Sequence, residues 1–229
     1  MKKLVLLIVI CSFCLLTRAQ LYMIEKISLP ATGEEFGIYS DINVENAPVI
    51  FYELQAPNPD QKVRAKLTYN EADSFISSLM RAKDIYINWS QITQQKGYTL
   101  FSKKIPTSFD DQNIDFTDKD KWHSEDGVDM LAVFFVNEKG KPFFILKSDY
   151  MTSDEVVGSF SSLSFSNMMG NPFIGVLGSS NSKYTIGRYC GGSTLTFSSP
   201  EEIDEFVNKL ISTMKWKEKN VSISKDFKK

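Results

Sequence analysis

Apolar side chains recur at helical spacing over residues 69–95, and this stripe limits the possible folds more than any other feature. Thr68 and Glu71 open the stripe as a capping box, in which each side chain accepts a hydrogen bond from the other residue's free backbone N–H. Neither Gly nor Pro interrupts the pattern before Gly97. A helix with so wide an apolar face packs against a sheet, so the rest of the chain has to supply one.

A second helical stripe covers residues 200–215, near the end of the chain. Ser199 is its expected cap, Pro200 takes the first helical position, and Glu202 completes a second capping box. After Trp216 the residues become basic and polar, so we expect the C-terminal tail to fray.

Most of the remaining chain has the pattern of β-strands. Apolar residues alternate with polar ones over 63–68, which is typical of a half-buried strand. The strongest strand predictions are 130–136 and 143–146, whose continuous apolar runs indicate central strands buried on both faces. Further strands are expected over 21–29, 35–42, 49–54, 98–105, 184–188 and 193–197. Residues 107–127 have no assignable pattern, and 152–158 suggest one helical turn.

These patterns together predict an α+β domain. Its sheet is expected to be mostly antiparallel and strongly twisted. Both amphipathic helices, over about 69–95 and 200–215, should pack on one face of that sheet.

The first nineteen residues form a separate unit. Two lysines precede the apolar run Leu4–Leu16, and Ala19 ends the segment with a small side chain, which is typical of a secretory signal peptide. The run is shorter than the roughly 20 residues that a membrane span needs. We therefore expect a cleaved signal peptide over 1–19 and a single domain over 20–229. The protein should be exported to the periplasm, the outer surface or the extracellular space, and should not be an integral membrane protein.

Charge and cysteine content narrow the function classes further. Without residues 1–19 the chain carries 23 basic and 28 acidic residues, and this net charge of −5 does not suit a nucleic-acid-binding protein. The whole chain is 42% hydrophobic with 17 Phe, which is enough to fill a core. Only Cys190 remains after the first segment, so stability must come from burial and not from disulfides. The Lys-Lys start without a disulfide framework favours a bacterial source.

Cys190 and His123 are the only cysteine and histidine outside the first nineteen residues. A thiol and an imidazole can form a nucleophilic pair, but these two lie 67 positions apart in the sequence and outside any catalytic signature. A lone cysteine more often behaves as a small buried hydrophobe. We therefore name no catalytic residue and keep an exported hydrolase or thiol enzyme as an alternative function.

An acidic segment over 110–129 is a candidate for calcium. Asp118 and Asp120 begin like a calcium loop, but Trp122 and His123 stand where a ligand and a glycine belong. A solvated surface loop is the preferred interpretation, with calcium-dependent binding as the alternative. Zinc would have too few nitrogen and sulfur ligands, so we expect no metal site and no cofactor.

Trp122 and a segment rich in Met and Phe are the candidate ligand contacts. Met168, Met169 and Phe173 stand among glycines and serines, a context that suits an adaptable binding surface or, alternatively, packing onto the core. Trp122 lies in a polar context and could stack on a sugar. We therefore expect a non-catalytic binding or interaction protein with an unidentified protein or glycan ligand, and the oligomeric state is left open.

Overall fold

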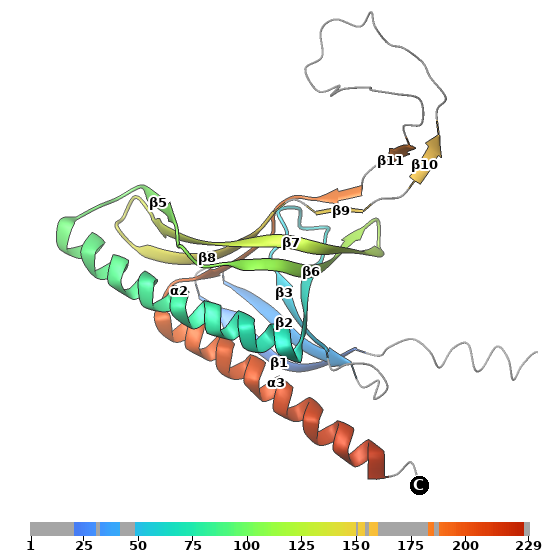
Figure 1. The fold of residues 1–229 in the computed structure, drawn as a ribbon. Helices are drawn as coiled ribbons and strands as arrows, with labels where there is room; N and C mark the ends of the chain where they lie inside the picture. The colour runs from blue at the N-terminus through green and yellow to red at the C-terminus, as the bar shows by residue number, and fades with distance from the viewer. Residues whose placement is uncertain are drawn as a thin grey trace, which may run out of the picture.

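Nine antiparallel strands form the main sheet of the computed structural model, which describes residues 21–30, 33–41, 49–149, 151–153, 156–159, 183–185 and 188–226. The strands are β1 (Leu21–Leu29), β2 (Glu34–Asp41), β3 (Val49–Leu54), β4 (Val63–Thr68), β5 (Phe101–Lys104), β6 (Phe109–Asp118), β7 (Lys121–Val136), β8 (Pro142–Ser148) and β13 (Thr194–Phe197). Their order is β1-β2-β3-β4-β6-β7-β8-β13, and β5 pairs with β7. With two long helices, this sheet confirms the predicted α+β fold class (Figure 1).

The two helices pack on the same face of this sheet (Figure 1). Helix α2 (Tyr69–Lys96) begins with the predicted capping box, in which the Thr68 N–H donates to the Glu71 carboxylate at 2.6 Å. It ends at Gly97, whose φ of 67° lies in the left-handed region that glycine tolerates best.

Helix α3 (Pro200–Asp226) is longer than the predicted 200–215. The Glu202 N–H donates to Ser199 Oγ as expected, but the Glu202 carboxylate accepts hydrogen bonds from the N–H and the hydroxyl of Ser198 instead of closing the box on Ser199. Past Trp216, Lys217 of this helix is buried against the end of β2.

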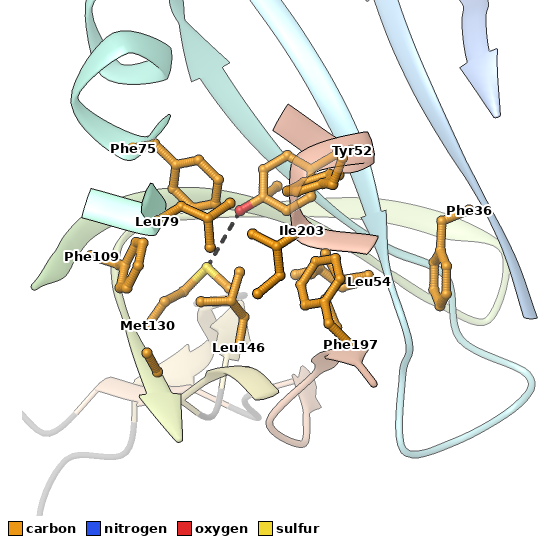
Figure 2. Packing of buried hydrophobic residues seen from close by; sticks show 14 of the residues in the cluster. Phe36, Tyr52, Leu54, Phe75, Leu79, Phe109, Met130, Leu146, Phe197 and Ile203 are labelled. Atoms are coloured by element: carbon orange, nitrogen blue, oxygen red, sulfur yellow. Dashed lines mark hydrogen bonds between the residues drawn. The ribbon is translucent and has the colours of Figure 1, made fainter. Parts of the chain in front are cut away.

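Aromatic side chains from the sheet and both helices meet in the core (Figure 2). The Phe206 ring of α3 packs 5.4 Å from Tyr52 of β3, 6.5 Å from Phe75 of α2 and 5.7 Å from Phe197 of β13, measured between ring centroids. The Tyr52 hydroxyl donates to the sulfur of Met130 at 3.6 Å. The apolar helix faces therefore fill the space that the sheet leaves on this side.

The last strand of the sheet, β13, also pairs with the residue after β3. Gln55, directly after β3, and Thr194 of β13 form an antiparallel bridge. Each backbone N–H donates to the other residue's carbonyl, at 2.8 and 2.9 Å. The pairing between β2 and β3 covers only Ile38–Ser40 and Ile50–Tyr52, so these two strands separate toward the end of β3 that carries the bridge.

The structure assigns residues 107–127, which had no predicted element, and corrects three local predictions. Residues 107–127 lie mainly in β6 and β7, where irregular register around Gln112 breaks the alternation that sequence reading looks for. Residues 152–158 belong to the short strands β9 (Met151–Ser153) and β10 (Val156–Ser159) instead of a helical turn, in keeping with the strand preference of Val. These strands pair with β12 (Arg188–Cys190) and β11 (Lys183–Thr185), which divide the strand expected over 184–188.

The third error concerns the strands expected to be buried on both faces. In β7, Ala132 and Phe134 are fully buried, whereas Leu131, Val133 and Phe135 are partly exposed. The strand therefore has one core face and one outer face. Because the residues on the outer face are also apolar, the alternation of burial does not appear as an alternation of apolar and polar residues in the sequence.

Candidate binding site on the outer sheet face

We call the sheet surface opposite the helices the outer face. Because side chains alternate along a strand, the residues between the core positions of β2, β3, β4 and β6 point to this surface. Aromatic and charged residues of these strands and of β7 gather there: Tyr39, Phe51, Glu53, Arg64, Asp115 and Trp122. Four of them form a connected group around Arg64.

Arg64 of β4 is fixed by a carboxylate and two aromatic rings. Its Nε and Nη2 donate to Asp115 Oδ2 of β6 at 2.9 and 2.8 Å. Asp115 Oδ1 in turn accepts a hydrogen bond from Ser124 Oγ at 2.5 Å. The guanidinium carbon lies 4.0 Å from the ring centroid of Trp122 and 4.7 Å from that of Phe51. These contacts hold the positive charge in one place between two π-faces.

Trp122 is the most exposed member of this group. It lies on β7 opposite Thr117 of β6, and 45% of its surface is accessible to solvent. Arg64 packs on its ring, so the indole is held in place while part of it stays open. A rigid aromatic side chain offers contact area at a small cost in conformational entropy. That Trp122 contacts a ligand stays a prediction.

Glu53 forms a second polar contact beside Arg64, which is its register partner on β4. Its carboxylate accepts hydrogen bonds from the Gly37 N–H and from the Tyr39 hydroxyl, both at 2.6 Å. Burial and the neighbouring Glu53 carboxylate raise the pKa of Tyr39. The Tyr39 ring covers Gly37 so closely that a Cβ there would come within 2.5 Å of it, which explains why this position is glycine.

A cavity of about 350 Å³ opens where β2 and β3 separate. We call it the β2–β3 cleft. Phe36 and Leu54 contribute apolar walls, whereas Glu35, Glu53 and Lys62 contribute charged groups. Its size falls in the range of about 300–1,000 Å³ that is typical of ligand pockets.

The structure does not bring Cys190 and His123 together as a nucleophilic pair. Cys190 is fully buried, with its Sγ 4.0 Å from Ser193 Oγ, and burial raises the pKa of its thiol. The His123 ring packs on Phe116, with the ring centroids 5.6 Å apart. A thiol with a raised pKa in apolar surroundings is a poor nucleophile near neutral pH.

The acidic segment is a strand hairpin and not the surface loop that we expected. Lys119 and Asp120 form the turn between β6 and β7, with φ values of 47° and 65°. Asp115 is engaged with Arg64. In the ranges that the structure describes, no group of three or more His, Cys, Asp or Glu residues is placed to hold a metal ion.

The remaining predicted contacts, Met168, Met169 and Phe173, lie outside the described residues. Arg64, Glu53 and Tyr39 were not among the candidates from the sequence, and Asp115 was considered only as part of the acidic segment over 110–129. Arg64 was visible only as a polar residue in an alternating strand, and its partner Asp115 is 51 positions away in the sequence.

Neither helix in the described part of the chain combines the length and the apolar character that crossing a membrane requires. No family model, curated protein or solved structure matches the chain.

Proposed function

We propose that the chain is an exported, non-catalytic binding protein that engages a protein partner through its outer face. The observation that carries this proposal is the fixed Arg64 between Phe51 and the half-exposed Trp122. Trp, Tyr and Arg dominate the binding energy of protein interfaces; on this face Arg64 packs on Trp122, and Tyr39 is bonded to Glu53, the register partner of Arg64. The charged start and apolar run of residues 1–19 support export to the periplasm, the outer surface or the extracellular space.

A protein partner suits this surface better than a glycan does. A sugar would use the exposed indole of Trp122, but it would not need the adjoining β2–β3 cleft with its strand edges and charged walls. The cleft lies next to the Arg64 group. Glu53 lines the cleft and is the register partner of Arg64. One partner can therefore contact both at once.

The test is a selection of random linear peptides on the immobilised full chain, with a glycan array probed in parallel. We expect peptides that bind the wild-type protein and lose more than about tenfold in affinity for Trp122→Ala, because truncating an interface hot spot costs about 2 kcal/mol or more. Tyr98→Ala is the matched control, since Tyr98 is a similarly exposed aromatic residue beyond the end of α2. Binding of glycans alone, or of peptides indifferent to Trp122→Ala, would contradict the proposal.

A further inference from the structure

Four of the seven large apolar side chains that are exposed in the described part of the chain lie at one end of the molecule. In chain order along the end of α2, the link to β5 and β5 itself, they are Ile92, Tyr98, Leu100 and Phe101. The turn between β7 and β8 lies at the same end, on the left of Figure 1. We call residues 92–104 and this turn, residues 137–141, the α2–β5 tip.

Backbone and ring contacts hold the parts of the tip together. The Leu100 N–H donates to the Asn137 carbonyl at 3.4 Å, which joins the link after α2 to the β7–β8 turn. The rings of Trp89 on α2 and Phe101 on β5 both pack against Phe134 of β7, at centroid distances of 5.7 and 6.3 Å. The exposed apolar side chains of the tip therefore rest on a common support.

Leu100 is exposed in a backbone conformation that does not favour leucine. Its φ of 52° lies in the left-handed region, where a side chain with a Cβ is disfavoured, and 74% of its surface is accessible to solvent. Glycine or asparagine fits such a backbone better. A large aliphatic side chain held in solvent at this cost points to a role outside the fold.

The tip is also basic, in contrast to the chain as a whole. Its segments carry five exposed lysines, which are Lys96, Lys103, Lys104, Lys139 and Lys141. Glu138 is their one carboxylate, so the tip has a charge of five minus one, or +4, whereas the whole chain has a net charge of −2. None of these lysines forms an ion pair with a carboxylate in the described part of the chain.

Two carboxylates of α3 lie near the border of the tip. Burial, and after it the nearby carboxylates of Glu202 and Glu201, raise the pKa of Tyr86. The Tyr86 hydroxyl donates to the carbonyl of Pro142, directly after the tip. Even with both carboxylates counted, the lysines are in excess.

A protein that docks on β5 as an added strand fits the tip less well than a lipid surface does. β5 pairs with β7 and with no second strand among the described residues, but it is only four residues long and carries Lys103 and Lys104. Short edge strands with lysines resist strand addition. Exposed aromatic and aliphatic side chains beside lysines are typical of segments that lie on a membrane surface.

We propose that the α2–β5 tip attaches the protein to the surface of a membrane that contains anionic phospholipids. The lysine ammonium groups approach the headgroup phosphates, and the side chains of Tyr98, Leu100 and Phe101 enter the boundary between headgroups and acyl chains. Each lysine near such a surface strengthens binding by about fivefold. The contact uses no residue of the Arg64 group or the β2–β3 cleft, so it does not rest on the proposed function.

Flotation of the full chain with lipid vesicles tests the proposal. One set of vesicles contains phosphatidylcholine alone and the other contains about 30% phosphatidylglycerol, and the ratio of the two partition coefficients is measured. The neutral vesicles account for lipid binding by the apolar residues 1–19. We expect a wild-type ratio above about tenfold at low salt, falling as salt screens the attraction.

Lysine variants locate the charged contact. Lys104→Gln combined with Lys139→Gln should lower the ratio by about tenfold or more. The matched control is Lys119→Gln combined with Lys121→Gln, which removes two exposed lysines at the β6–β7 turn and should leave the ratio within about twofold of the wild-type value.

Leu100→Asn tests the apolar contact without disturbing the fold. Because asparagine tolerates the left-handed backbone, this variant should unfold at the same urea concentration as the wild-type protein. Its partition coefficient on anionic vesicles should fall by about fivefold. Met23→Asn is the matched control, since Met23 is 55% exposed on the edge strand β1, and it should leave partitioning unchanged.

A wild-type ratio near one, or equal losses in the tip variants and their controls, would overturn the proposal. An acidic protein as the true occupant would appear as binding of soluble polyglutamate that survives Leu100→Asn, with no preference for anionic vesicles, and would overturn it as well. Trp122→Ala should leave vesicle binding unchanged, so membrane attachment and the proposed function can fail independently.

Discussion

Phe206→Ala is expected to lower the free energy of unfolding by about 3–5 kcal/mol. Phe206 is only 2% exposed, and its ring packs against Tyr52, Phe75 and Phe197. Truncation would leave a cavity where α3, α2, β3 and β13 meet, and the surrounding rings cannot collapse fully into it. Equilibrium unfolding in urea, followed by far-ultraviolet circular dichroism, measures the loss.

Phe101→Ala is the matched control for this change. Phe101 lies on β5 and is 39% exposed, so the same truncation removes fewer buried contacts and should cost about 1 kcal/mol. Similar losses for both variants would mean that α3 does not pack on the sheet as described.

Lys217→Met is expected to destabilise the protein by about 3–5 kcal/mol through a different mechanism. Lys217 of α3 is 1% exposed, and its Nζ donates to Asp41 Oδ1 at 2.7 Å and to the Asp41 backbone carbonyl. Methionine fills much of the same space but leaves the buried Asp41 carboxylate without its cation. An uncompensated buried charge costs more than the lost attraction alone, which is why removing one partner has so large an effect.

Two further variants separate charge from packing at this position. Adding Asp41→Asn to Lys217→Met removes the stranded charge and should recover part of the lost stability. Lys215→Met, on the exposed side of the same helix, should stay within about 0.5 kcal/mol of the wild-type protein. If Lys217→Met unfolded at the same urea concentration as Lys215→Met, the buried pair would not hold α3 to β2.

The sequence predicts best those features that depend on neighbouring residues. The start of α2 was correct because Thr68 and Glu71 exchange hydrogen bonds within one turn. The predicted α3 ended too early, and the Lys217–Asp41 pair just beyond the predicted end joins distant segments and leaves no local signal. Residues 107–127 had no assignable pattern because irregular register interrupts the alternation in the β6–β7 hairpin.

The candidate site was predictable only in part, for the same reason. Trp122 could be chosen because a large aromatic residue in a polar segment is unusual. Its packing on Arg64, and the pairing of Arg64 with Asp115, depend on the order of β4, β6 and β7 in the sheet. The β2–β3 cleft depends on the separation of two strands, close to the bridge between Gln55 and Thr194. Neither arrangement is visible in a linear pattern.

The two faces of the sheet have different roles in this account: one stabilises the fold, and the other is proposed to bind a partner. The helix-facing side holds the aromatic core around Phe206, on which stability depends. The outer face holds the Arg64 group and the cleft, which we propose for binding. Variants on the two faces should therefore affect different quantities. Phe206→Ala should lower the free energy of unfolding, and Trp122→Ala should lower the affinity for the ligand.

Backbone hydrogen exchange of the full chain, with and without a saturating amount of the tightest selected peptide, tests this division in one measurement. We predict that bound peptide slows exchange in residues 33–41 of β2 and its preceding turn and in residues 121–126 of β7, and leaves α2 and α3 unchanged. Protection confined to the helices or to β8, with none in these two segments, would contradict binding on the outer face around Trp122.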